Sequence, residues 1–255
     1  MYVYSTGLRD EEIHVNEGRV FGGVAIGIIL FGQTGYAFPP GSVENATTFR
    51  YPVHYRYIRA ASVESVVSPQ PHPEVLAQLI EAGRELETQG CRAIIGACGY
   101  FANYLPQVKH ELKTPCFFSS LIQVPLILRS LRPEQKVGVL CANGQVLHEA
   151  PALKNCGVDP ETVVISGAEV LPEMQKILDG VGHYNPYQLE LGLVELAKEL
   201  AAEHPEVGAF LLECTLFPTH AHAVQRAVRL PVWDFSTLVD WVYSAAVRRP
   251  FAGYM

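Results

Sequence analysis

Gly96–Tyr104 reads GACGYFANY and directly follows the short apolar run Ala93–Ile95. A β-branched run that ends in small residues and continues into a helical stretch is typical of a parallel strand that turns into a helix. Cys98 lies at this turn, at the carboxyl end of the predicted strand and beside a helix N-terminus. The peptide N–H groups and the helix dipole favour an anion there, so we expect the pKa of this thiol to lie below its usual value of about 8.5.

The same pattern occurs again 116 residues further along the chain, from position 98 to position 214. The apolar run Ala209–Leu212 leads to Cys214, and a helix is predicted over 217–229. Each cysteine is followed 17 residues later by a proline that opens a further strand, Pro115 in the first copy and Pro231 in the second. An internal duplication therefore relates the two cysteines, which are the candidate catalytic residues.

The composition is that of a globular protein, because 49% of the 255 residues are hydrophobic and 18% are charged. A formal net charge of −7 argues against nucleic acid as a partner. The longest apolar run, Val24–Phe31, is far shorter than the roughly 20 residues that span a membrane, so no membrane segment is expected. Residues 1–23 are acidic and lack the apolar core of a signal peptide, which predicts a cytoplasmic protein.

The alternation of strands and helices predicts an α/β fold of two lobes, each a parallel sheet flanked by helices. We expect the first lobe over 1–131 and the second over 132–255, with a linker at Arg132–Gln135 and a final helix that crosses back onto the first lobe. The predicted strands are 24–31, 52–61, 92–97, 116–119, 136–142, 162–166, 207–213 and 231–235. The predicted helices are 73–89, 101–112, 121–131, 145–155, 186–203, 217–229 and 236–247. Residues 1–21 are expected to form an irregular arm, and a variable stretch is expected from 167 to Asn185.

Ligands of parallel sheets bind at the carboxyl ends of the strands, and a long loop over 38–48 follows the first strand there. Its hydroxyls, amide and glycine suit an anion, so Asn45, Thr47 and Thr48 are expected to line the cleft and point between the two cysteines. The alternative is a surface loop held by its own turn chemistry. Ser120 is expected at the rim of the cleft, and its repeat partner Ser236 is expected to cap a helix.

Several common sites are absent from the sequence. No Gly-x-Gly-x-x-Gly opens a helix and no Gly-Lys-Ser/Thr loop occurs, so no nucleotide cofactor is predicted. His220 and His222 would lie about 200° apart on the predicted helix, which excludes a shared metal ion with Cys214. The six cysteines do not form a disulfide scaffold in a chain of this length, and we interpret those outside the repeated turns as small buried hydrophobic residues: Cys91, Cys116, Cys141 and Cys156.

Leu212–Pro218 reads LECTLFP and resembles the second catalytic motif of the aspartate/glutamate racemase superfamily, and Gly96–Phe101 occupies the place of the first. The loop over 38–48 and the stretch Phe118–Gln123 resemble one branch of that superfamily, and the resemblance covers residues 24–247. It implies two pseudo-symmetric lobes with the active site between them and, in many relatives, a homodimer. Its members are cofactor-independent racemases, hydantoin racemases, maleate isomerases, arylmalonate decarboxylases and dimethylsulfoniopropionate lyases, which use cysteine for chemistry next to a carboxylate.

The sequence departs from the glutamate racemase pattern in three places. Gly99 and Tyr100 follow the first cysteine where Asn-Thr is expected, and Leu216 replaces a histidine after the second. Phe31-Gly32 ends the first strand where an Asp-Ser pair is expected. The missing polar groups would handle a substrate amine or its protons, so these departures argue against an α-amino acid as the substrate.

The leading hypothesis is a cofactor-independent racemase or isomerase that acts on a small carboxylic acid, namely an amino acid or a derivative of one. One thiolate and one thiol, about 6–7 Å apart, would serve as base and acid on opposite faces of the carbon next to the carboxylate, so loss of either cysteine would stop racemisation. The carboxylate would be held by backbone N–H groups or side chains of Asn45, Thr47, Thr48, Gly99, Tyr100, Ser120, Thr215 and Leu216. The alternatives are a decarboxylase or β-elimination lyase that uses the same cysteines, and a carboxylate-binding protein without catalysis.

Overall fold

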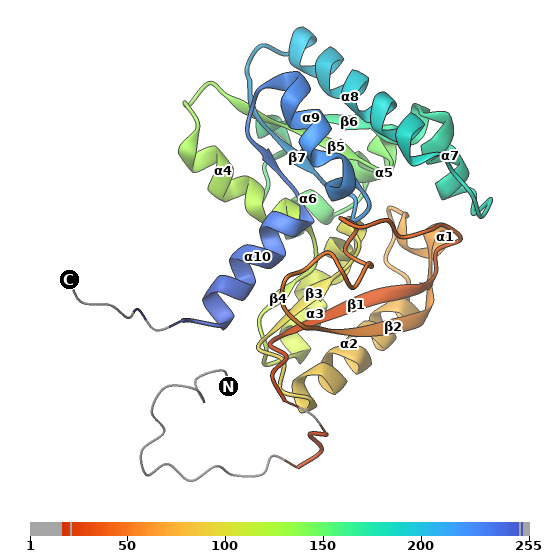
Figure 1. Cartoon of the computed structure of the whole chain (residues 1–255), viewed down its shortest axis with the longest axis vertical. Helices are drawn as coiled ribbons and strands as arrows, with labels where there is room; N and C mark the ends of the chain where they lie inside the picture. The colour runs from red at the N-terminus through yellow and green to blue at the C-terminus, as the bar shows by residue number, and fades with distance from the viewer. Residues whose placement is uncertain (1–16, 21, 250, 252–255) are drawn as a thin grey trace.

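The computed structural model describes residues 17–20, 22–249 and 251, so most of the arm expected over 1–21 lies outside the described residues (Figure 1). The first sheet contains β1 (Ile26–Gln33), β2 (Val53–Ser62), β3 (Ala93–Gly96) and β4 (Cys116–Phe117), in the order β2-β1-β3-β4. The second contains β5 (Lys136–Cys141), β6 (Val163–Gly167), β7 (Val207–Leu212) and β8 (Val232–Trp233), in the equivalent order β6-β5-β7-β8. Every strand pair is parallel. The predicted fold of two equivalent α/β halves is confirmed.

The strands at the centre of each sheet are covered on both faces, which explains their continuous apolar sequences. All six residues of β7 and all four of β3 are buried. Glycines in β1 and β5 make room for side chains from the covering helices, because a Cβ at Gly27 would collide with Leu86 of α2 and a Cβ at Gly138 would press on Leu200 of α8. The strands therefore form the centre of the core, and the turns that follow their carboxyl ends form the candidate site.

Helices cover both sheets. Those of the first half are α1 (Val63–Val66), α2 (Pro73–Thr88), the 3-10 helix η1 (Gly99–Tyr104), α3 (Leu105–Glu111), the 3-10 helix η2 (Ser120–Gln123) and α4 (Val124–Ser130). Those of the second half are α5 (Gly144–Glu149), α6 (Ala152–Asn155), η3 (Pro160–Thr162), η4 (Ala168–Val170), α7 (Pro172–Leu178), α8 (Pro186–Glu203), η5 (Phe217–His220), α9 (Ala221–Val228) and α10 (Phe235–Ala246).

Three helices that the sequence predicts as continuous are divided into a 3-10 turn and an α-helix. Pro106 and Pro125 lie in the first turn of α3 and α4, where a missing backbone N–H costs nothing, so each α-helix begins only after the 3-10 turn. The stretch that the sequence leaves variable before Asn185 contains η4 and α7. With seven residues, α7 is too short to give a clear helical period, although Met174 and Ile177 bury one face of it.

The two halves exchange their helices. The last helix, α10, follows β8 but packs on the first sheet, where Leu238, Val239 and Val242 join a buried cluster with Ile28 and Ile95. In the same way, α4 follows β4 but contacts β5 of the second sheet. Figure 1 shows α4 beside the second sheet and α10 beside the first. This exchange joins the halves through apolar packing on both sides of the site.

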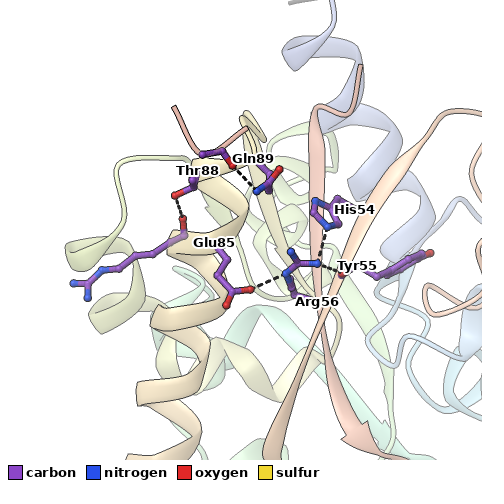
Figure 2. Close-up of polar contacts among 8 residues, drawn as sticks. His54, Tyr55, Arg56, Glu85, Thr88 and Gln89 are labelled. Carbon is purple, nitrogen blue, oxygen red and sulfur yellow. Dashed lines mark hydrogen bonds and ion pairs between the residues drawn. The ribbon is translucent and has the colours of Figure 1, made fainter. Parts of the chain in front are cut away.

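The outer face of β2 is joined to α2 by polar contacts (Figure 2). Arg56 Nε forms a 2.7 Å ion pair with Glu85 Oε2, and its guanidinium also contacts the His54 ring at 2.7 Å and the Tyr55 carbonyl oxygen at 3.4 Å. The Arg56 and Glu85 side chains are 35% and 53% exposed, so this pair contributes at most about 1 kcal/mol to stability. Among the described residues, no helix is long and apolar enough to cross a membrane.

Candidate active site

A small cavity lies where the carboxyl ends of β3 and β7 face each other across the two halves. It has a volume of about 30 Å³, which is room for about two water molecules. Six of the residues that the sequence predicts for the site line it: Cys98, Gly99, Tyr100, Cys214, Thr215 and Leu216. The remaining lining residues are Phe31, Tyr36, Val63, Val67, Ala142, Met174, Ile177, Leu178 and Glu213.

The two cysteine turns have the same local geometry. In each, the cysteine carbonyl oxygen accepts a 3.0 Å hydrogen bond from the backbone N–H three residues later, at Phe101 and Phe217. These bonds open η1 and η5, and they leave both side chains at the cavity wall. The duplicated sequence thus produces two equivalent turns, one from each half, with one thiol each.

Burial raises the pKa of both thiols, so the expectation that the pKa of Cys98 lies below its usual value is wrong. After burial, the largest cause is the carboxyl group of Glu213, which disfavours a second negative charge nearby. Backbone N–H groups act in the opposite direction, as the sequence predicts: Tyr100 lowers the pKa of Cys98, and Leu216 and Phe217 lower the pKa of Cys214. Two backbone N–H groups therefore favour a thiolate at Cys214, whereas only one favours a thiolate at Cys98.

Glu213 is a residue of the site that the sequence reasoning missed. It follows β7 directly, is 0% exposed and borders the cavity. Burial raises the pKa of its carboxyl group from 4.5 to about 8, so the group is mostly protonated at neutral pH. An ionisable residue at the end of a fully buried apolar strand was the signal in the sequence, since burial without a partner is costly for such a group.

The loop over 38–48 does not place its predicted polar residues in the cavity, and this expectation is corrected. Asn45 Nδ2 donates to the Phe38 carbonyl oxygen at 2.8 Å, Thr47 Oγ1 donates to Asn45 Oδ1 at 2.7 Å, and Thr48 Oγ1 donates to the Ser42 carbonyl oxygen at 2.6 Å. These groups satisfy one another within the loop, which is the turn chemistry of the alternative interpretation.

The residue of this loop that approaches the cysteines is Glu44. Thr215 Oγ1 donates to Glu44 Oε1 at 2.5 Å, so the Thr215 hydroxyl that we expected to face a substrate carboxylate is directed to a protein carboxyl group. Burial raises the pKa of Glu44 to about 7, and the hydrogen bond from Thr215 lowers it. A second acid is therefore held close to the thiols.

Ser120 and Ser236 also differ from the prediction. Ser120 is fully buried and donates from Oγ to the Leu212 carbonyl oxygen at 3.1 Å, so it ties η2 to β7 and does not lie at a cleft rim. The N-cap of α10 is Asp234, whose side chain accepts the Thr237 N–H, and Ser236 Oγ donates to Asp234 Oδ1 at 2.6 Å. Both serines support the fold because the β4 and β8 turns are packed into the interface of the halves.

The rest of the wall is aromatic and apolar. Tyr100 crosses to the second half, where its hydroxyl donates to the Asn143 carbonyl oxygen at 2.7 Å and accepts the Asn143 N–H at 3.0 Å. Tyr36 and Phe31 contribute further rings. None of the described residues that line the cavity is Lys, Arg or His. The site therefore combines thiols, buried acid groups and aromatic rings, and its described lining contains no basic side chain that could neutralise an ionised acid.

Comparisons with known proteins relate the chain to curated enzymes and to solved structures. No family model matches the chain. It is 31% identical over 228 residues to dimethylsulfoniopropionate lyase 6 of Emiliania huxleyi, a match that covers 86% of this chain and 59% of that protein. It is 30% identical over 223 residues to a dimethylsulfoniopropionate lyase of Durusdinium, with 84% of this chain and 72% of that protein covered. The chain thus spans about three fifths of the length of the first of these curated relatives.

Solved structures share the fold at low identity. Unliganded arylmalonate decarboxylase matches with a TM-score of 0.53 and 17% identity, over 91% of this chain and 97% of the other. A glutamate racemase from Bacillus anthracis matches with a TM-score of 0.56 and 12% identity, over 87% and 82%. Allantoin racemase from Pseudomonas fluorescens matches with a TM-score of 0.53 and 15% identity, over 90% and 99%.

The fold and the relatives confirm the resemblance seen in the sequence, to the aspartate/glutamate racemase superfamily of cofactor-independent enzymes. Within that superfamily, the chain belongs to the family that contains the dimethylsulfoniopropionate lyases it matches.

Proposed function

We propose that the chain is a cofactor-independent lyase that eliminates the β-substituent of a small carboxylate, with dimethylsulfoniopropionate as substrate. The observation that carries the proposal is the acidic lining of the cavity: two thiols and the buried Glu213 carboxyl group, with no basic side chain among the described lining residues. A substrate that brings its own positive charge suits such a site. The names of the relatives support the same substrate.

The positive charge of the substrate would also lower the raised pKa of the two thiols. Burial and nearby acids raise the pKa of Cys98 and Cys214 in the empty cavity. A sulfonium ion that enters the cavity favours a thiolate, because an opposite charge within a few ångströms stabilises the ionised form. The substrate is therefore expected to help ionise the base that attacks it.

In the proposed reaction, the Cys214 thiolate removes a proton from the carbon next to the carboxylate. A double bond forms between the α- and β-carbons, the carbon–sulfur bond breaks, and its electron pair leaves with the sulfur as neutral dimethyl sulfide. The other product is acrylate, and the Cys214 thiol returns its proton to solvent. Cys214 is the preferred base because two backbone N–H groups, from Leu216 and Phe217, lower its pKa.

The substrate carboxylate is expected to lie against the backbone N–H groups at the two cysteine turns, from Gly99 and Thr215. Donors fixed in advance at this position stabilise the charge that develops next to the carboxylate, and loss of one such donor typically costs 10²- to 10³-fold in rate. The cavity of about 30 Å³ is smaller than this substrate, so apolar lining residues must move to admit it.

The test is release of dimethyl sulfide and acrylate from dimethylsulfoniopropionate by the full chain. We expect release by the wild-type protein and by Cys116→Ala, whose thiol lies outside the cavity, and loss of release in Cys214→Ala. If none of these proteins releases dimethyl sulfide, the proposal is wrong.

Racemisation or isomerisation is the second candidate, because equivalent turns from pseudo-symmetric halves present one cysteine each to the same cavity. In heavy water, a racemase would place deuterium at the α-position of a small acid without releasing a fragment, a decarboxylase would release carbon dioxide, and a binding protein would do neither. A homodimer and a cytoplasmic location are further parts of the proposal, and light scattering of the purified protein and imaging of a tagged chain in cells test them.

A further inference from the structure

Glu213 is buried in the cavity wall with little polar support. Its side chain is 0% exposed, and neither Oε1 nor Oε2 forms a hydrogen bond of standard geometry with the described residues, although the Ala142 backbone N–H acts on the carboxyl group. A buried polar group without a partner destabilises the folded protein, and more so when it is charged. A buried carboxyl group with so little polar support beside a cavity therefore indicates that a bound ligand supplies its partner.

The protein itself supplies no positive charge to this carboxyl group. The titratable groups that influence or are influenced by it are weak acids from several elements: Cys98, Tyr100, Cys141, Cys156 and Cys214. The backbone amide of Ala142 is the one group that favours its ionised form. The described residues therefore offer no cation that would stabilise the ionised form of Glu213 at neutral pH, and such a cation would have to come with a ligand.

The Glu213 carboxyl group fits into its position because Gly99, from the other half, has no side chain. A Cβ atom at Gly99 would overlap Oε1 of Glu213 and also crowd its carboxyl carbon. Gly99 occupies the position where the glutamate racemase pattern has asparagine. An asparagine there would collide with Glu213, so the glycine at 99 and the glutamate at 213 depend on each other across the two halves. The carboxyl group occupies the volume that a side chain at position 99 would fill.

The neighbouring wall suits a methylated cation better than a primary ammonium group. An ammonium group carries three N–H donors, and the lining offers few acceptors besides Glu213. Sulfonium and quaternary ammonium groups need no hydrogen bonds, and they bind well against aromatic rings. Phe31, Tyr36 and Tyr100 provide such rings in the same cavity.

We propose that Glu213 is the counter-ion for a methylated onium group of the substrate and the residue that determines this specificity. The inference rests on the proposed function, since it concerns the same cavity and names the group that selects the substrate. When the onium group binds, it forms an ion pair with the Glu213 carboxylate, and the proton of Glu213 leaves to solvent.

The test compares two ligands of the same shape with the full chain, by calorimetry. The probe with a cationic head group, called the cationic probe, is 3-(trimethylammonio)propanoate. The control with an uncharged head group, called the neutral probe, is 4,4-dimethylpentanoate, in which carbon replaces the nitrogen and the carboxylate is kept. We expect the wild type to bind the cationic probe about 10- to 100-fold more tightly, the range for a hydrogen-bonded or paired charge. Glu213→Gln should lose this preference and bind the neutral probe about as well as the wild type does.

Glu44→Gln is the matched control, because Glu44 is the other buried acid near the thiols and does not line the cavity. We expect it to keep the preference for the cationic probe. The inference is overturned if Glu213→Gln keeps the preference, if Glu44→Gln alone loses it, or if 3-aminopropanoate binds the wild type better than the methylated probe does.

A second measurement needs no variant and covers the case in which Glu213→Gln fails to fold. Because the cation binds the ionised carboxylate, wild-type affinity for the cationic probe should rise as the pH increases toward about 8, and affinity for the neutral probe should not follow it. Affinity that is independent of pH for both probes would overturn the inference. Neither probe reports on dimethyl sulfide release, so failure of the lyase reaction and failure of this inference are separate results.

Discussion

Thr215 Oγ1 donates a 2.5 Å hydrogen bond to Glu44 Oε1, and so joins the second cysteine turn to a loop 171 residues earlier in the chain. The Val43 N–H reinforces the contact by donating to the Thr215 carbonyl oxygen at 3.1 Å. The hydroxyl and the carboxyl group belong to opposite halves, next to the candidate catalytic thiols. This contact therefore couples the position of the loop over 38–48 to the geometry of Cys214.

Thr215→Val should destabilise the protein by about 1–3 kcal/mol, because it leaves the buried Glu44 Oε1 without its donor. It should also raise the pKa of Glu44 further, since the Thr215 hydrogen bond lowers it. Urea-induced unfolding measures the first effect. Thr219→Val is the control: its hydroxyl donates to the exposed Pro40 carbonyl oxygen at 3.3 Å, so a loss below about 0.5 kcal/mol is expected. Equal losses in the two variants would contradict the assigned role of Thr215.

The two cysteines should be unequal in the lyase reaction. Cys214→Ala should lower kcat about 10²- to 10⁴-fold, the usual contribution of a general base, and Cys98→Ala should retain more activity. The reason is that two backbone amides favour a thiolate at Cys214 and one favours it at Cys98. Initial rates of dimethyl sulfide release check this. Near-complete loss in both variants, with deuterium exchange retained from one face, would instead support the two-base racemase.

The free energy of unfolding should fall as the pH rises from about 4.5 to 8. The folded chain holds protons on Glu44 up to a pKa of about 7 and on Glu213 up to about 8, whereas the unfolded chain releases them near 4.5. Between these values the folded state binds more protons, so raising the pH favours unfolding. Thermal unfolding across this range should show the decline.

Glu213→Gln should reduce that decline and stabilise the protein at pH 8.5 by a few kcal/mol, because each pKa unit corresponds to about 1.4 kcal/mol. Glu85→Gln, which breaks the exposed ion pair with Arg56, is the control and should change stability by less than about 1 kcal/mol. If the free energy of unfolding of Glu213→Gln depends on pH in the same way as that of the wild type, this carboxyl group does not titrate as described.

Gly99 and Glu213 should be coupled in a double-mutant cycle. Gly99→Ala alone should destabilise the protein by about 1–3 kcal/mol, because its Cβ overlaps the Glu213 carboxyl group. In the background of Glu213→Ala, which removes that group, the same substitution should cost less, with a coupling energy of about 0.5–3 kcal/mol. Denaturant unfolding of the four proteins gives the value. Additive effects would mean that the two residues do not share this space.

Much of the fold could be predicted because it depends on local pattern. Continuous apolar runs predict the strands, and β3 and β7 lie within one or two residues of the predicted bounds. The repeated turns predict that Cys98 and Cys214 face one cavity, since carboxyl ends of parallel strands lie at one edge of a sheet. The short α7 gave no usable period, because seven residues make only about two turns.

The loop residues Asn45, Thr47 and Thr48 show why polar composition alone misled the prediction. Hydroxyl and amide groups suit an anion, but they bind equally well to the backbone of their own turn, and here they do. The choice between these two outcomes depends on what the loop packs against. Glu44, an acid in the same loop, is the group that packing turns toward the thiols.

Residues close together in the chain specify the two α/β halves, the duplicated turns and the two cysteines at their strand ends. The electrostatics of the site instead depend on how the two halves pack together. Glu213 becomes a buried acid because Gly99 of the other half leaves room for it, and burial then raises the pKa of both thiols. Desolvation depends on every neighbour that excludes water, and half of the other residues that line the cavity lie more than 100 residues before Glu213 in the chain.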